Sequence, residues 1–454
     1  MPDQPRLDAP GIQVSDAIRN ERVVTFRGGL LPAVSAETLD LRTSGRGSPP
    51  LNPALMTMRR VYLDHSATTP ADPRVVEAML PYLTQKFGNA SSVHSFGQEA
   101  RAAADRARRQ VAALVGARAN EIIFTSGGTE ANNLAIRGVC ELAKAHGRHV
   151  ITSSIEHPSV RGAIDSLEKR GWDITRLPVY DDGIVRIDDV RSALREDTVL
   201  VTVMTANNEI GTIQPIEKIG ALVKEERGRG HPNLWFHTDA VQAAGRLPLQ
   251  VEDLGCDLLS ISAHKIYAPK GTGALFVRRG VRLAPQQVGG HQERERRAGT
   301  ESIANIVAFG AAAELARREL TERNEHTRRL RDRFESGVVK SIDDIAFNGN
   351  REQRLPHLSN ISFRFIEGEG LLIHLDMQGV AVSTGSACSS GTLEPSPVIR
   401  ALGRNEELAR GAIRFSFGKD NTDDDIDYAL AALQRAVESL RKLSPLSRET
   451  VAAS

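Results

Sequence analysis

Short apolar runs alternate with helical stretches along the middle of the chain, from Val61 to about residue 318. The apolar runs predict buried strands at residues 121–126, 149–154, 198–205, 234–239 and 258–264. Apolar residues at helical spacing predict helices between these strands, at residues 130–145, 159–171 and 216–228. A repeated strand–helix–strand order is typical of an α/β fold, so we expect a mostly parallel sheet covered by helices on both faces.

The pattern changes after residue 318. A long helix rich in Arg and Glu is predicted to about residue 340, and it is followed by strands at 357–365 and 412–418 and by a last amphipathic helix. Thr422 and Asp425 have the spacing of a capping box at the start of that last helix. This part of the chain therefore predicts a second, smaller α+β domain.

These changes divide the chain into four predicted parts. Residues 1–57 contain no lysine and show no sustained period, so we expect a disordered extension, or a misassigned start with translation beginning at Met56 or Met58. We expect residues 58–75 to be an N-terminal arm that joins the small domain. The large domain is predicted at 76–318 and the small domain at 319–454.

Composition excludes several classes of protein. The net charge is +1, so no overall field draws the chain to nucleic acid or to an anionic membrane. No apolar run reaches the length of a membrane span. The three cysteines, Cys140, Cys256 and Cys388, are odd in number and widely spaced, which argues against a disulfide framework and for a reducing, cytoplasmic setting. No Cys or His spacing predicts a metal site.

Polar residues follow the predicted strands, at the edge of a parallel sheet where ligands bind. The turn "SGGTEA" at residues 126–131 leads into a helix, and such a turn can hold a phosphate with backbone N–H groups. Asp239 ends one apolar strand and Lys265 follows another. A strand-end lysine, a strand-end carboxylate and a phosphate cradle together fit pyridoxal phosphate, which needs a Schiff-base lysine, an acid for its ring nitrogen and an anion site.

Six sequence blocks carry a resemblance to a known family: "YLDHSATTP", "FTSGGTEANN", "NNEIG", "SAHKIY", "GSACSSGTLEPS" and "IRFSFG". In their order and spacing the chain resembles a cysteine desulfurase of the NifS/IscS type. This type belongs to the class V aminotransferase group of fold-type I pyridoxal-phosphate enzymes. The resemblance runs from about residue 62 to 445 and implies that residues 76–318 bind the cofactor.

The resemblance implies a role for each residue that matches a family block. Lys265 would bind pyridoxal 5'-phosphate covalently, Asp239 would pair with its ring nitrogen and His157 would stack on the ring. Asn208 and Gln242 would contact the ring's 3-oxygen. The phosphate would be held by Gly128, Thr129, Ser262 and His264, joined by Thr300 from the other subunit of a homodimer.

The resemblance also implies the substrate and the sulfur path. Arg414, with Asn208 beside it, would bind the carboxylate of L-cysteine, Lys265 would act as the base, and Cys388 would take the sulfur as a persulfide while L-alanine is released. Cys388 lies in "STGSACSSG", a run of small residues suited to a mobile tether. Acceptors would be an iron–sulfur scaffold or a relay for tRNA or cofactor thiolation, with a transient contact of Cys388 to an iron–sulfur cluster.

Two alternatives stay open at this point. A selenocysteine lyase or another enzyme of the class V aminotransferase fold would need Lys265 and Asp239 but not the loop cysteine. A catalytically silent protein that relays sulfur through Cys388 is the other. The sequence also departs from the family's blocks: His291, Glu295 and Ala268 replace glycines, and Ala90 replaces a proline. The first two put the shape of the Thr300 contact in doubt.

Overall fold

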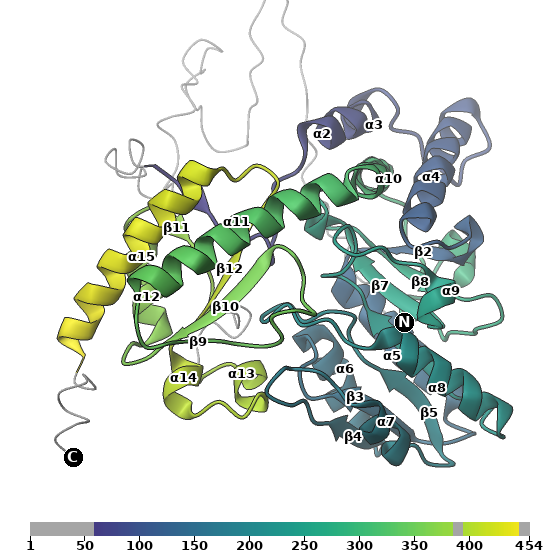
Figure 1. Cartoon of the computed structure of the whole chain (residues 1–454). Coiled ribbons are helices and arrows are strands. Elements are labelled where there is room, and N and C mark those ends of the chain that lie inside the picture. Colours follow the sequence, from purple (N-terminus) through teal and green to yellow (C-terminus); the bar gives the residue numbers. More distant parts are fainter. Residues whose placement is uncertain (1–58, 385–393, 445–454) are drawn as a thin grey trace, which may run out of the picture. The chain divides into compact units, whose positions relative to one another are not determined.

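The computed structural model describes residues 59–384 and 394–444, within the compact unit Arg59–Ser454. The larger of its sheets has seven strands in the order β2-β8-β7-β6-β5-β3-β4 (Figure 1). Their bounds are β2 Ile122–Thr125, β3 His149–Ser153, β4 Asp173–Leu177, β5 Thr198–Thr202, β6 Trp235–Asp239, β7 Leu258–Ser262 and β8 Gly273–Val277.

The five predicted strands are present, and the prediction of a mostly parallel sheet is confirmed. Every neighbouring pair is parallel except those of β8, which runs antiparallel to both β2 and β7. Strands such as β5 are buried along their whole length, because helices cover both faces of the sheet. The sequence analysis did not predict β4, an edge strand with polar residues such as Asp173 and Arg176, or β8.

Helices connect the strands and cover the sheet. The helices of this part are α2 Pro73–Met79, α3 Pro81–Thr84, α4 Ser95–Leu114, α5 Gly128–Ala143, α6 Pro158–Glu168, α7 Ile187–Ala193, α8 Ile216–Gly228, α9 Val251–Leu254 and α10 Ile303–Arg318, with short 3-10 turns η2 Ala119–Glu121, η3 Ala263–Lys265 and η4 Gln292–Glu295. Local sequence explains where some of them begin: α6 starts at Pro158, with the ring of His157 accepting a hydrogen bond from the N–H of Ser159.

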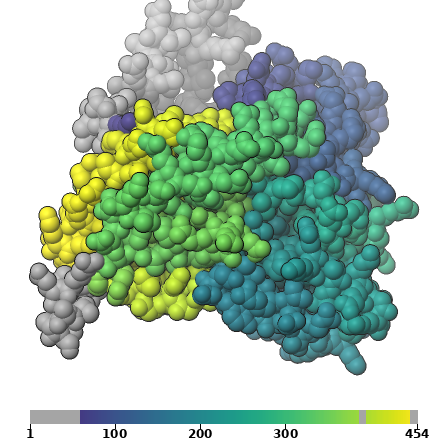
Figure 2. Space-filling view, viewed as in Figure 1, coloured from purple at the N-terminus to yellow at the C-terminus, as the bar shows by residue number. Residues whose placement is uncertain are grey.

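The remaining elements form the smaller part of the fold. An antiparallel sheet of β9 Ile345–Phe347, β10 Leu358–Phe363 and β12 Ala412–Ser416 has the order β12-β10-β9. Its helices are α11 Leu320–Ser341, α12 Gly368–Asp376, α13 Pro397–Ala401, α14 Glu406–Arg410 and α15 Asp423–Leu443. The capping box predicted for Thr422 and Asp425 is confirmed at the start of α15. In the space-filling view, the green and yellow residues of this part lie directly against the teal residues of the larger part (Figure 2).

The start of the described chain lies beside the smaller part. β1 Val61–Tyr62 pairs in parallel with β11 Val380–Ala381, and Asp64 forms a bridge with Ser416. The predicted division of the chain into four parts stays a prediction. Among the described residues, no helix is both long and apolar enough to cross a membrane.

The core of the smaller part depends on tilted aromatic rings from α11, from β12 and from the residue just after β12. Phe334 lies 4.6 Å from Phe415 and 5.6 Å from Phe417, centroid to centroid, and all three rings are buried. Tightly packed aromatic residues contribute strongly to stability, because their removal leaves a cavity that neighbours cannot fill.

We expect Phe334→Ala to lower the free energy of unfolding by about 3–5 kcal/mol. Val339→Ala on the same helix is the control, since Val339 is 57% exposed and its loss should cost less than about 0.5 kcal/mol. Chemical denaturation of both variants measures the difference. Equal stability of the two variants would show that the ring cluster does not hold this core together.

Candidate active site

A cavity of about 380 Å³ lies where the strands of the large sheet end. Its wall takes residues that follow β2, β3, β6 and β7, together with residues of the smaller part on α13 and β12. Ten of the predicted site residues line it: Gly128, Thr129, His157, Asn208, Asp239, Gln242, Ser262, His264, Lys265 and Arg414. Two do not: Thr300 is exposed outside the cavity, and Cys388 lies outside the described residues.

Asp239 ends β6 with a carboxylate that is fixed by two neutral donors. Its Oδ2 accepts a hydrogen bond from the amide of Asn132 at 2.7 Å, and its Oδ1 accepts one from the N–H of Val241 at 2.9 Å. The side chain is almost completely buried but still faces the cavity. The carboxylate is therefore held in one orientation at the base of the cavity, ready for a cationic or N–H partner.

His157 presents a neutral ring to the same cavity. Its Nδ1 accepts a hydrogen bond from the N–H of Ser159 at 3.1 Å, so the ring proton belongs on Nε2. Burial lowers the pKa of His157, against the opposing charge of Asp239. A neutral, oriented imidazole can lie flat against an aromatic ligand without competing for a proton.

Lys265 lies at the end of η3, directly after β7. Its Nζ donates hydrogen bonds to the carbonyl of Ala67, at 2.7 Å, and to the carbonyl of Ser66. Desolvation, helped by the positive charges of Arg414 and Arg246, lowers the pKa of Lys265 from 10.5 to about 7. A lysine with such a pKa has a large neutral fraction at physiological pH, which nucleophilic and base chemistry require.

The turn into α5 provides the anion side of the cavity. Gly128 and Thr129 are the first residues of that helix, whose N-terminus favours negative charge. A side chain at Gly128 would come within 2.7 Å of Val241, so glycine keeps the backbone open here. His264 contacts the hydroxyl of Thr68 at 3.0 Å, and burial lowers the pKa of its ring to about 4. Both histidines therefore act as neutral hydrogen-bonding groups near neutral pH.

Arg414 crosses from β12 into the cavity with its side chain only 3% exposed. One terminal nitrogen pairs with Asp64 at 2.7 Å and the other donates to the carbonyl of Asn208 at 2.8 Å. Its Nε has no hydrogen-bond partner in the described part of the chain. A ligand carboxylate would have to share this guanidinium with Asp64, a residue that sequence reasoning did not single out although it lies in "YLDHSATTP".

The structure adds two buried carboxyl groups that sequence reasoning missed. Glu156 accepts hydrogen bonds from the hydroxyl of Ser153 and the N–H of Met204, and burial raises its pKa to about 8. Glu209 accepts a hydrogen bond from Ser396 at 2.5 Å, and burial raises its pKa too. Glu156 and Glu209 lie just after predicted strands, next to His157 and Asn208, to which the resemblance assigns roles. Their position after a strand, at the edge of the sheet where ligands bind, was the signal in the sequence that could have indicated them.

Two polar atoms of the cavity wall have no hydrogen-bond partner among the described residues, and together with the charges of the wall they fit bound pyridoxal phosphate. Gln242 donates to the carbonyl of Ser66 at 2.9 Å, but its Oε1 has no partner among the described residues, and the same holds for Nε of Arg414. Buried polar atoms of native proteins are nearly always hydrogen-bonded, so such orphans indicate a missing polar ligand. A carboxylate, a near-neutral lysine and a helix N-terminus on one cavity match the groups of this cofactor.

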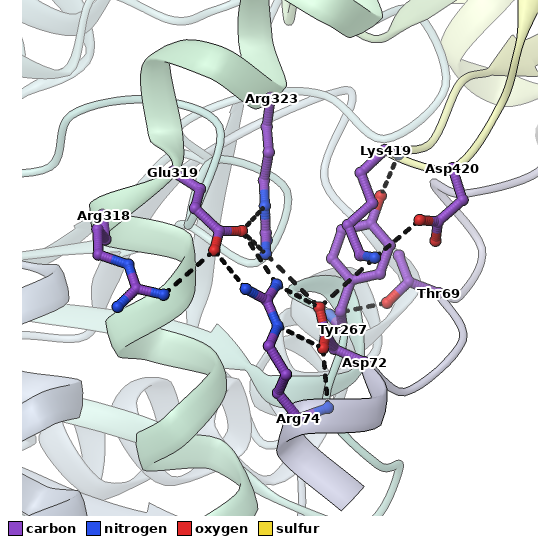
Figure 3. Close-up of polar contacts among 9 residues, drawn as sticks. All are labelled: Thr69, Asp72, Arg74, Tyr267, Arg318, Glu319, Arg323, Lys419 and Asp420. Carbon is purple, nitrogen blue, oxygen red and sulfur yellow. Dashed lines mark hydrogen bonds and ion pairs between the residues drawn. The ribbon is translucent and has the colours of Figure 1, made fainter.

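The turn after Lys265 is held by Tyr267, whose backbone is in the left-handed region with φ of 70°. Its N–H donates to Thr69 Oγ1 at 2.9 Å, and its carbonyl accepts from the N–H of Asp72 at 2.9 Å. Its ring lies between Arg323 and Lys419, whose charged groups are 5.1 and 5.3 Å from the ring centroid (Figure 3). These contacts stabilise a strained backbone beside the lysine.

The departures from the family's blocks lie away from the cavity wall. His291 and Glu295 are exposed and contact each other at 2.7 Å. Ala268 and Ala90 are buried, and neither has a positive φ, so a side chain at these positions causes no backbone strain. The contact predicted for Thr300 stays a prediction.

Residues 61–429 match the family described as Aminotransferase class-V. Cysteine desulfurase IscS of Dictyoglomus turgidum is 51% identical over 391 residues, which are 86% of this chain and 98% of that protein. Cysteine desulfurase IscS of Methanosarcina thermophila is 48% identical over 389 residues, 86% of this chain and 95% of that protein.

Solved structures of related proteins have the same fold. A NifS-like protein superposes with a TM-score of 0.78 at 36% identity and covers 84% of this chain and 100% of its own. A structure described as SspA in complex with cysteine has a TM-score of 0.70 at 34% identity, with coverage of 80% and 99%. The prediction of a fold-type I enzyme architecture is thereby confirmed.

We expect Lys265→Met to stabilise the cofactor-free protein by about 5 kcal/mol at pH 6. Below the folded pKa of about 7 the wild-type protein buries a charged amine, whereas above the ordinary value of 10.5 the amine is neutral in both the folded and unfolded states. The gain should therefore fade as pH rises from 7 to 10.5. Lys270→Met, at an exposed position, is the control. A gain independent of pH, measured by thermal unfolding, would contradict the lowered pKa.

Proposed function

Because the chain belongs to the Aminotransferase class-V family, we propose that it is a pyridoxal-phosphate-dependent cysteine desulfurase, which converts L-cysteine to L-alanine and keeps the sulfur as a persulfide on Cys388. The observation that carries this proposal is the meeting of Lys265, Asp239 and Arg414 on one cavity. Relatives named cysteine desulfurase, 51% and 48% identical over 86% of the chain, support it.

The cofactor would be held by residues of the large sheet. Lys265 would bind it covalently, Asp239 would accept a hydrogen bond from its ring nitrogen and His157 would lie against the ring. Gln242 and Asn208 would contact its 3-oxygen, and Gly128, Thr129, Ser262 and His264 would bind its phosphate. When bound, pyridoxal phosphate accepts the electron pair that the substrate's Cα loses with its proton.

Arg414 would bind the substrate carboxylate, with Asn208 beside it. Its unpartnered Nε and the nitrogen now paired with Asp64 offer two donors in the planar arrangement that a carboxylate prefers. Arg414 also contributes to the low pKa of Lys265. A bound carboxylate would offset that positive charge, so substrate binding would change the proton affinity of the base that must act next.

The amine of Lys265 would take the proton from the substrate Cα and later return a proton. The Cys388 thiolate would attack the substrate sulfur, forming an S–S bond while the Cβ–S bond breaks. The electrons of the broken bond remain on the carbon side, where protonation gives alanine. Residues on either side of the segment that carries Cys388 support the proposal. Ser383 forms backbone hydrogen bonds with Arg414, and the hydroxyl of Ser396 donates to Glu209. Arg414 and Glu209 both line the cavity.

The persulfide would pass to an acceptor protein, an iron–sulfur scaffold or a thiolation relay, in the reducing setting of the cytoplasm. The other two cysteines are poorly suited to this chemistry. Cys140 and Cys256 are fully buried, and burial raises the pKa of both thiols. A thiol must lose its proton to act as a nucleophile, so these two cysteines have a structural role in the proposal.

We also propose a homodimer in which Thr300 completes the phosphate site of the partner. Support comes from exposed apolar side chains between the end of α2 and the start of α4, where the rings of Phe87 and Phe96 lie 5.8 Å apart. Leu80, Leu83, Phe87, Val93 and Phe96 are each more than half exposed there. Exposed apolar groups of this extent are typical of protein interfaces.

We expect Cys388→Ser to keep cofactor binding and the spectral change on adding L-cysteine, because Lys265, Asp239 and Arg414 are unchanged. Release of alanine should fall at least ~100-fold, since a hydroxyl is a poor nucleophile toward sulfur. The wild-type protein, given cysteine without reductant, should gain the mass of one sulfur atom on the peptide that contains Cys388.

Cys140→Ser and Cys256→Ser are the matched controls, and both should still gain the sulfur. Sulfur found on either of these cysteines, or full alanine release by Cys388→Ser, would contradict the proposed role. Full turnover of selenocysteine by Cys388→Ser, without cysteine turnover in the wild type, would indicate a selenocysteine lyase instead.

We expect Leu83→Glu with Phe87→Glu to convert a dimer into monomers of 49.4 kDa, because two charges would be buried in the apolar interface. Light scattering after gel filtration measures the mass, and absorbance measures bound cofactor, which should fall with the loss of Thr300 of the second copy. Met377→Glu is the control, since Met377 is 70% exposed just after α12, away from these residues. A monomeric wild-type protein would exclude the dimer.

A further inference from the structure

A second, smaller cavity of about 20 Å³ also reaches Lys265. Its wall includes four cationic side chains, Arg246, Lys265, Arg323 and Lys419, and the ring of His357. Among the described residues that line it there is no Asp or Glu. A cavity of this size holds one water molecule or one small ion.

Arg246 is the side chain whose charge has no partner here. It is 7% exposed, and its guanidinium donates only to the carbonyls of Gln242 and His65, each at 3.5 Å. Within residues 59–384 and 394–444, no carboxylate forms an ion pair with it. Burial lowers the pKa of Arg246 to about 10, so the group is still charged near neutral pH. An unpaired buried charge is costly unless an anion accompanies it.

Two of the other cations on this cavity wall, Arg323 and Lys419, are paired with carboxylates (Figure 3). Arg323 pairs with Glu319 at 2.7 Å, and Lys419 pairs with Asp420 at 2.8 Å and Asp72 at 3.5 Å. The same network takes in Arg74, bound to Asp72 and Glu319, and Arg318, bound to Glu319, so that four cations meet three carboxylates. Lys265 has a pKa of about 7 and donates to two carbonyls, so Arg246 is the fully charged side chain of this wall that has no carboxylate partner among the described residues.

Two buried histidines beside Arg246 provide neutral donors. His357 is 2% exposed, its Nε2 lies 3.2 Å from the hydroxyl of Ser66, and its Nδ1 has no partner among the described residues. Nδ1 of His65 is likewise unpartnered. If Ser66 donates to Nε2, the ring proton of His357 is on Nδ1 and is available to an anion in the cavity.

We propose that this cavity binds one monovalent anion of halide size, chloride under physiological conditions, between the guanidinium of Arg246 and the ring of His357. The site is separate from the cavity proposed to hold the cofactor, and it does not depend on the proposed reaction. A water molecule would fill the space but would leave the charge of Arg246 uncompensated. An anion offsets that charge and with it part of the repulsion that Lys265 experiences from Arg246.

Bromide tests the site directly, because its anomalous scattering distinguishes it from water. Crystals of the full-length protein with its cofactor, soaked in sodium bromide, should show an anomalous peak within about 3.5 Å of the Arg246 guanidinium. Arg246→Gln crystals should lack this peak and keep any bromide bound at the surface. A wild-type structure with bromide on the surface, and water or nothing in the cavity, would overturn the proposal.

A solution experiment measures the effect on Lys265. The charged groups that act on it are Arg414, Arg246, Asp64 and Asp239, with His157 and His264 neutral nearby. Replacing gluconate by chloride at constant ionic strength should raise the pH midpoint of the bound cofactor's absorbance change. Arg246→Gln should lose this dependence, whereas Arg414→Gln, altered in the large cavity, should keep it.

The opposite pattern, with dependence lost in Arg414→Gln and kept in Arg246→Gln, would place chloride in the large cavity and contradict the proposal. If Arg246→Gln does not fold, the wild-type protein and Arg414→Gln still decide the matter, together with the bromide peak. A protein that binds no cofactor would contradict the proposed function, but the bromide experiment would still test the anion site.

Discussion

Desolvation of the Lys265 amine is the constraint on which the rest of the site depends. The amine has a pKa of about 7 because it is largely buried in the cavity wall and because Arg414 and Arg246 lie nearby. Each of these two buried arginines needs hydrogen-bond acceptors or a counter-charge of its own, because an unpaired buried charge is costly. Arg414 has Asp64 and the carbonyl of Asn208, whereas Arg246 has two distant carbonyls. The two cations that help to lower the pKa of Lys265 thus determine which carboxylates and carbonyls must lie around them.

Hydrophobic patterning predicted the large sheet well, because strands buried on both faces are continuous apolar runs. It failed for β4, where Asp173 and Arg176 face solvent at the edge of the sheet and the sequence looks like a loop. It also missed β8, although that strand is apolar and buried along its whole length. The residues at strand ends were predictable for a similar reason: once the order of strands is known, parallel strands place Asp239, Lys265 and the residues after β3 at one edge. Most of the predicted site residues accordingly line one cavity.

What the sequence could not predict is the pairing between distant segments. Asp64 and Arg414 are 350 residues apart, and nothing in either block indicates that one holds the other. Arg246 follows a short turn and resembles a surface arginine in the sequence, yet it is buried. Glu156 and Glu209 are directly adjacent to His157 and Asn208, to which the resemblance gave a role, but nothing local indicated that the two glutamates are buried. Such burial depends on how the two parts of the fold pack together, and local propensity carries no information about that packing.

The pairing of the first described residues with much later ones has a consequence for biosynthesis. Val61 pairs with Val380, the carbonyl of Ala67 binds Lys265, and Asp64 binds Arg414. Contacts of such long range close late in folding, since chain entropy opposes them until most of the protein has been ordered. A nascent chain that ends before β12 lacks the partner of Asp64 and so cannot complete the surroundings of the lysine. The environment that lowers the pKa of Lys265 can therefore be completed only after β12, which carries Arg414, has been synthesised.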